Sequence, residues 1–134
     1  MSLERRTVTV AQEKQFENKI KRYLKVRGIY PLGTPADKMT VKPVGYYEKR
    51  WGGGRYVKAG LLDLHIVIRG VSLEVEVKAQ DGIESELQKQ KREQIIDSGA
   101  LAYVAYPSGW EKLKDIIDGL LIDKFNREED VILK

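Results

Sequence analysis

Residues 61–79 constrain the fold more than any other part of the sequence, because apolar and polar residues alternate along them with a period of two. Such alternation places successive side chains on opposite faces of a β-strand. The alternation is interrupted at Arg69-Gly70, and glycine at the second position of a two-residue turn is typical of a β-hairpin. We therefore predict two antiparallel strands in which the numbers of paired residues sum to 139.

This register brings three polar side chains onto one face of the hairpin. Asp63 is expected directly across from Glu76, and Lys78 follows one step further along the same face. A turn placed one residue later would pair Asp63 with Lys78, but the period of two keeps all three on one face. Two adjacent carboxylates repel each other, and hard oxygen ligands suit Mg²⁺ or Mn²⁺. The pattern predicts a divalent-metal site; the alternative is a solvated face on which Glu76 pairs with Lys78.

Apolar residues at helical spacing predict three helices, at residues 10–27, 85–98 and 109–121. Gly28 is a stop signal for the first helix. Ser85 and Gln88 fit a capping box at the start of the second. Trp110, near the start of the third, is expected in the core.

Two further strands are expected. Residues 100–106 have the apolar content of a short buried strand. Residues 44–51 are expected to form an irregular strand. The latter lies in a Pro- and Gly-rich excursion at about residues 29–59. The order α-β-β-β-α-β-α predicts an α/β fold with a mixed central sheet flanked by helices.

The composition limits the class of protein. A chain of 134 residues with 42% hydrophobic content is typical of a single domain, here residues 1–134. The absence of cysteine excludes disulfides and thiol chemistry. Without a signal-peptide pattern or a long apolar run, the protein is expected to be soluble and cytoplasmic, with no membrane partner.

Charge is distributed unevenly along the chain. Residues 1–60 contain 14 Lys and Arg against 5 Asp and Glu, and residues 61–134 contain 10 against 15. A basic half followed by an acidic half favours a polyanion-binding surface beside a carboxylate site. The candidate DNA contacts are Lys21, Arg22 and Lys25 in the first helix, and Arg55 and Lys58 in the excursion.

The hairpin and the helix after it resemble the virus-type replication-repair nuclease (VRR-NUC) family of the PD-(D/E)XK nucleases. The resemblance rests on Asp63, on Glu76-Val77-Lys78 and on the Ser85-Glu86-Leu87-Gln88 helix start, and it extends over about residues 13–117. It implies a restriction-endonuclease-like core. The sequence departs from the family in having Leu62 where a proline is usual, and in the length of its excursion.

The resemblance also implies site residues. Asp63, Glu76 and the Val77 carbonyl would bind Mg²⁺ or Mn²⁺, and Lys78 would serve the attacking water. Glu17 would complete the site from the first helix, with Glu13 as its rival.

Gln88 resembles a glutamine that lies against the site in this family, although a purely structural capping role is the alternative. His65 shares the hairpin face with the site and is expected to form hydrogen bonds or contact DNA. Glu74, on the same face, is expected to pair with a base.

The function implied is that of a divalent-metal-dependent DNA endonuclease, selective for branched DNA like a Holliday-junction resolvase. A non-catalytic or sequence-specific DNA-binding module on the same fold is the alternative. By resemblance the protein is bacterial or phage-encoded. A homodimer is expected, with apolar surface from one sheet edge or the third helix, near Tyr103, Tyr106 and Trp110; the alternative is that these aromatics are buried within the monomer.

Overall fold

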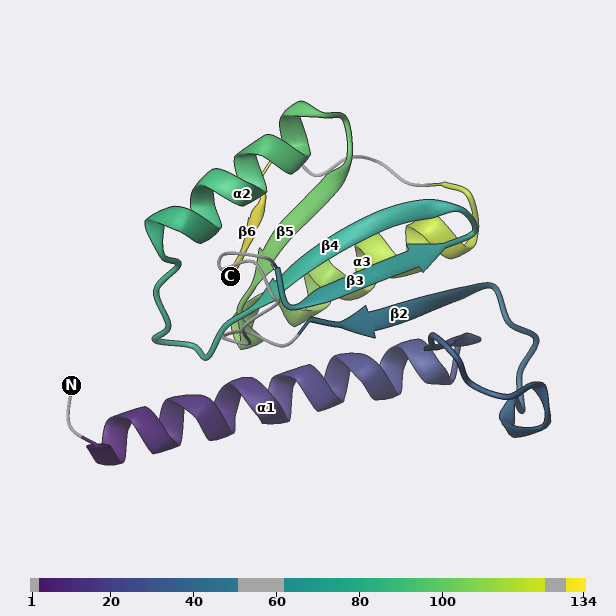
Figure 1. Ribbon diagram of the computed structural model, residues 1–134, viewed down its shortest axis with the longest axis horizontal. Coiled ribbons are helices and arrows are strands. Elements are labelled where there is room, and N and C mark those ends of the chain that lie inside the picture. Colours follow the sequence, from purple (N-terminus) through teal and green to yellow (C-terminus); the bar gives the residue numbers. More distant parts are fainter. Residues whose placement is uncertain (1–2, 51–61, 125–129) are drawn as a thin grey trace.

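The computed structural model describes residues 3–50, 62–124 and 130–134 (Figure 1). The strands are β1 (Ile29–Pro31), β2 (Gly45–Lys49), β3 (Leu64–Ile68), β4 (Val71–Val77), β5 (Leu101–Ala105) and β6 (Ile132–Leu133). The helices are α1 (Leu3–Lys25), α2 (Glu86–Asp97) and α3 (Trp110–Leu121), with 3₁₀ turns η1 (Ala36–Lys38) and η2 (Pro107–Gly109). None of the described helices has the length and apolar character needed to cross a membrane.

The predicted hairpin is confirmed in its register. Leu64 pairs with Val75 and Ile68 pairs with Val71, so each pair sums to 139. Arg69 and Gly70 have φ values of 49° and 84°. A two-residue turn of type I′ requires positive φ at both central positions, and this requirement explains why glycine follows Arg69.

Around the hairpin, the described strands form one mixed sheet in the order β1-β2-β3-β4-β5-β6. β2, β3 and β4 run antiparallel in sequence, and α2 then carries the chain to β5, which lies parallel to β4. This confirms an α/β fold with a mixed sheet and the predicted order of the longer elements. The short edge strands β1 and β6 were not predicted, because three and two residues are too few to show a period.

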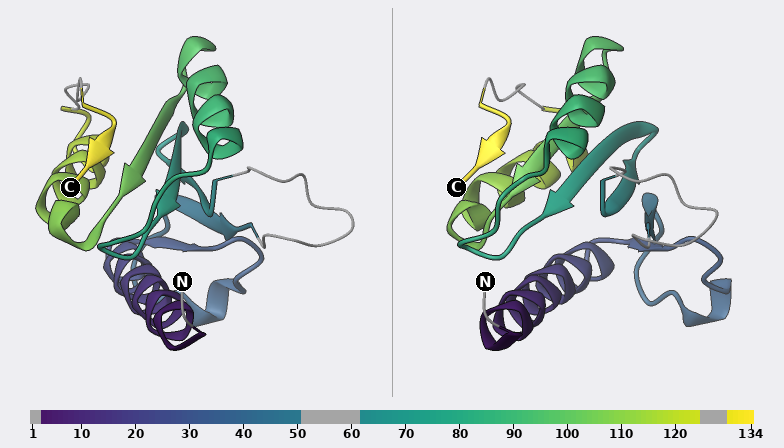
Figure 2. Two further views of the ribbon diagram at one scale, coloured as in Figure 1. Left: turned by 90° about the vertical axis from the view of Figure 1, so that its left-hand side faces the viewer. Right: turned by 60° about the vertical axis from the view of Figure 1, so that its left-hand side comes forward.

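The sheet has a helix layer on each side (Figure 2). α1 and α3 cover the face to which Leu73, Val75 and Val77 point, and there they form the hydrophobic core. α2 lies over β5 on the opposite face, to which β4 contributes Glu74 and Glu76. Both glutamates are nevertheless buried. The sheet therefore separates an apolar layer from one that holds charged groups.

α1 begins seven residues before the predicted start at Val10. The apolar stripe that signals a core-facing helix begins only with Phe16, since Val8 and Val10 are exposed. Periodicity therefore detected the part of the helix that packs on the sheet and missed the part that does not.

Candidate functional site

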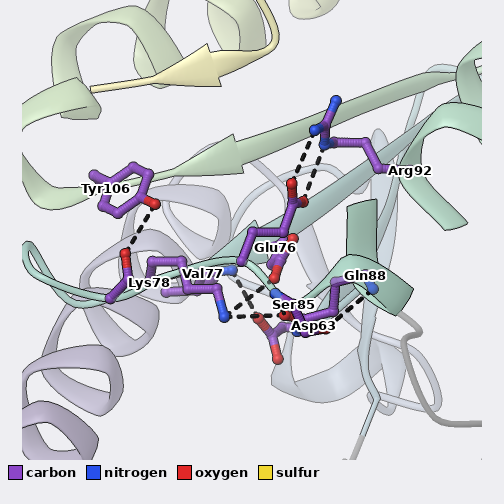
Figure 3. Close-up of polar contacts among 10 residues, drawn as sticks. Asp63, Glu76, Val77, Lys78, Ser85, Gln88, Arg92 and Tyr106 are labelled. Carbon is purple, nitrogen blue, oxygen red and sulfur yellow. Dashed lines mark hydrogen bonds and ion pairs between the residues drawn. The ribbon is translucent and has the colours of Figure 1, made fainter. Parts of the chain in front are cut away.

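The predicted site residues gather where β3 begins and β4 ends (Figure 3). Asp63 directly precedes β3, and its Oδ2 accepts a hydrogen bond of 2.7 Å from the Val77 amide. Lys78 follows β4, with its Nζ 3.2 Å from Glu76 Oε1 and 3.1 Å from Gln88 Oε1. Direct contacts thus join five of the predicted residues in two sets, Asp63 with Val77, and Lys78 with Glu76 and Gln88.

Glu76 is the most unusual group at this site. Its side chain is 0% exposed, and neither carboxylate oxygen accepts a hydrogen bond from the described residues. Burial, together with contact with the Glu84 carboxyl, raises the pKa of Glu76 to about 8 against the opposing effect of Lys78. A buried carboxylate without hydrogen bonds is costly unless a proton or a cation compensates it.

Asp63 is in a less extreme environment. Burial raises its pKa, while the hydrogen bond from the Val77 amide and the charges of Lys49 and Lys78 lower it. In a β-strand the N–H and C=O of one residue point to the same side, so the Val77 carbonyl is directed toward the Asp63 side of β4. The Val77 amide is thus the backbone partner of Asp63 in the structure.

Gln88 has both of the roles weighed from the sequence. Ser85 Oγ accepts from the Gln88 amide at 3.1 Å, and Gln88 Oε1 accepts from the Ser85 amide at 3.0 Å. This reciprocal pair is the predicted capping box. Because Gln88 Oε1 also accepts from Lys78, the cap that starts α2 also holds the lysine of the site.

The two α1 carboxylates lie in different charge environments, although both line a pocket of about 170 Å³ with Asp63 and Val77. Glu17 forms ion pairs with Lys14, Lys21 and Lys49. Burial alone would raise the pKa of Glu17, but hydrogen bonds from Lys49 and Lys21 lower it.

Glu13 is only half-buried, and burial raises its pKa. The charged groups that act most strongly on Glu13 are Lys78 and Asp63. The structure therefore brings Glu13, the rival, closer to the predicted chemistry, while Glu17 neutralises lysines.

Sequence reasoning missed a pair of charged residues beside Glu76. Glu84 precedes α2, and Arg92, one turn after Gln88, donates hydrogen bonds of 3.0 and 2.8 Å to its two oxygens. The spacing of Gln88 and Arg92 puts them on one helix face, and that spacing was the available signal. Arg92 was given no role from the sequence.

Four other charged or aromatic residues extend the polar face of the sheet. Glu74 accepts from Arg50 at 2.7 Å and contacts His65 Nδ1 at 2.5 Å, and the His65 ring lies edge-on to Tyr46. Glu74 does pair with a base, and His65 does form a hydrogen bond, as expected. Their hydrogen-bonding roles are therefore satisfied within the chain.

The candidate DNA contacts have different surroundings. Arg22 and Lys25 are exposed on α1, whereas Lys21 is partly buried by its ion pair with Glu17. Arg55 and Lys58 lie outside the described residues. Only Arg22 and Lys25 are thus seen on an open surface.

The apolar surface expected for a dimer is not available. Tyr103 and Tyr106 are 2% and 7% exposed, because β5 is an interior strand whose side chains are covered by helices. Trp110 packs edge-on against Phe16 and Tyr23 and belongs to the core, as predicted. The choice of these tyrosines as interface residues was wrong.

Within the described residues, no three acidic, histidine or cysteine side chains converge as a metal cluster. The donor set still fits a hard cation in two respects. The Glu76 oxygens are buried and accept no hydrogen bond, and Asp63 and Glu76 both lie close enough to Lys78 for its charge to lower their pKa values. Mg²⁺ keeps several waters and needs only one or two protein carboxylates.

Comparison of the chain with protein-family models, with curated proteins and with solved structures found no match.

Proposed function

We propose that the protein is a divalent-metal-dependent DNA endonuclease. The observation that carries the proposal is the Glu76 carboxylate, fully buried and without a hydrogen bond, beside the Lys78 ammonium. Lys78, at 3.2 Å, is the ion partner of Glu76 among the described residues, and a folded protein rarely buries a carboxylate with so little compensation except at a functional site. A bound cation would compensate that charge.

The topology supports the same proposal. Three antiparallel strands, β2 to β4, are followed by a helical crossover to the parallel strand β5. With α1 before them, these elements follow the order expected of the PD-(D/E)XK core. Glu76 lies on β4 and Asp63 directly precedes β3, positions that agree with the resemblance.

Each residue then has a part in phosphodiester hydrolysis. Asp63, Glu76 and the Val77 carbonyl would hold the Mg²⁺ or Mn²⁺ ion, which when bound polarises a phosphate oxygen and lowers the pKa of water. Lys78 would orient the attacking water and offset negative charge that develops on the phosphate. Gln88 keeps the lysine in place through its 3.1 Å hydrogen bond.

We assign the α1 carboxylate of the site to Glu13, because the charges of Lys78 and Asp63 act on it most strongly. Glu17 has the separate part of keeping Lys21 and Lys49 in place. The DNA backbone would lie along α1, with Arg22 and Lys25 on phosphates. Selectivity for branched DNA and a homodimer remain expectations from the resemblance.

Incubation of the purified chain with branched, nicked and linear DNA tests the proposal, with Mg²⁺, Mn²⁺ or EDTA in parallel. We expect cleavage with the metals and none with EDTA. Lys78→Ala should lose at least about 100-fold in cleavage rate while it still binds DNA. Lys112→Ala, on the exposed side of α3, is the matched control and should cleave normally.

Binding without cleavage under every metal condition would favour the non-catalytic DNA-binding module. Full activity of Lys78→Ala would remove the lysine from the mechanism.

A further inference from the structure

Glu84 has a buried partner that fixes its carboxylate. Its side chain is 12% exposed, and Arg92, at 8%, donates to both of its oxygens. Among the described residues of α2, Arg92 is the buried one. Arginine binds a carboxylate through two parallel hydrogen bonds, an arrangement that fixes direction as well as distance. Glu84 is therefore a rigid group rather than a solvated surface residue.

This rigid carboxylate is in contact with the Glu76 carboxyl beneath α2. Glu84 raises the pKa of Glu76, after burial itself, and hydrogen bonds from Arg92 lower the pKa of Glu84 against the effect of its own burial. Arg92 thus favours a full negative charge on Glu84. The fixed negative charge faces a second carboxylate that cannot reach water.

Neither Glu76 oxygen accepts a hydrogen bond from a described donor, and the hydrogen bond that joins Glu76 to Glu84 requires a proton on Glu76. Lys78 lies 3.2 Å from Oε1, but its hydrogen bond goes to Gln88. Among the described residues, no donor hydrogen-bonds to Oε2. The space between the two carboxylates therefore has the negative charge, the oxygen ligands and the shortage of donors that suit a cation.

We propose that a divalent cation, Mg²⁺ or Mn²⁺, binds between the carboxylates of Glu76 and Glu84, with Arg92 holding Glu84 in position. Two carboxylates and several retained waters are a normal ligand set for Mg²⁺. The inference rests on the proposed function in that both use Glu76 as a ligand. It adds Glu84, to which the sequence assigns no role, and it makes Arg92 a positioning residue.

Titration of the full chain with Mn²⁺ tests this site without any DNA. Calorimetry should show binding, and the unfolding temperature should be higher in Mn²⁺ than in EDTA. Glu84→Gln should weaken Mn²⁺ binding at least about tenfold and remove most of the rise in unfolding temperature. The control, Glu93→Gln, changes an exposed glutamate of the same helix and should bind like the wild type.

Glu84→Gln could also weaken the fold through Arg92. Glu84→Asp keeps the charge that Arg92 needs but withdraws the oxygens from Glu76, so it should also bind Mn²⁺ more weakly while it unfolds like the wild type in EDTA. Wild-type affinity in both variants would overturn the inference, as would a wild-type chain that binds no Mn²⁺.

The inference and the proposed function fail separately. Glu84-dependent Mn²⁺ binding in a chain that cleaves no DNA would refute the nuclease and leave the cation site. Metal-dependent cleavage with unchanged Mn²⁺ affinity in Glu84→Gln would refute the cation site between Glu76 and Glu84 and leave the proposed nuclease.

Discussion

The two faces of the sheet are covered by helices of opposite character. α3 buries Leu113, Ile116, Ile117 and Leu120, whereas α2 buries Arg92 among its described residues. Leu87, one of the apolar residues of α2, is 41% exposed. α2 is thus held by a capping box and by the Arg92–Glu84 pair more than by apolar burial. The comparison teaches that one face supplies the apolar packing of the domain, while the other buries charged groups such as Glu76 and Arg92.

The largest difference between the two faces is expected when one buried or partly buried side chain in each helix is shortened to alanine. Leu113→Ala in α3 should cost about 2–5 kcal/mol of unfolding free energy, because it leaves a cavity in a packed core. Ile95→Ala in α2 removes a partly exposed side chain and should cost well under half as much. Urea unfolding measures both. Equal costs would show that α2 is packed as tightly as α3.

A smaller effect concerns pH and Glu76. Its folded pKa of about 8 lies above the ordinary value of 4.5, so the folded state retains a proton that the unfolded state releases. Stability in EDTA should therefore fall as pH rises from about 5 to 8, by no more than about 1.4 kcal/mol per pH unit. Glu76→Gln should flatten this dependence. Thermal unfolding of both proteins from pH 5 to 8 measures it, and identical pH profiles would contradict the assignment to Glu76.

The smallest effect is expected at the start of α2. Ser85→Ala removes the side chain that accepts from the Gln88 amide and should cost about 1 kcal/mol. If α2 depends on its cap as the comparison suggests, hydrogen exchange should increase through α2 and remain unchanged in α3. Uniform exchange across both helices would mean that the cap supports the whole domain.

The hairpin was predictable because its signals are local. Alternation and one glycine determine the register, and the register places Asp63, Glu76 and Lys78 without any knowledge of the rest of the chain. The capping box was predictable for the same reason, since it involves residues three apart.

The misses required tertiary information. Glu84 acquires its part from Arg92, eight residues away, and from Glu76 on another element. The ion pair of Glu17 with Lys49 could not be foreseen either, because Lys49 lies on β2, far from Glu17 in the sequence. Tyr103 was assigned to an interface because a strand pattern does not say whether the strand lies inside the sheet.

Gln88 Oε1 accepts from the first amide of a helix cap and from the lysine of the site. This one oxygen atom therefore has two structural roles: it caps the start of α2, and it positions the Lys78 ammonium group. At the third helical position of a capping box glutamate or glutamine is usual, and a shorter side chain would not reach back to the cap. Fewer residues can therefore stand at position 88 than the helix cap or the lysine contact alone would allow. A substitution of Gln88 should disturb both the start of α2 and the position of Lys78.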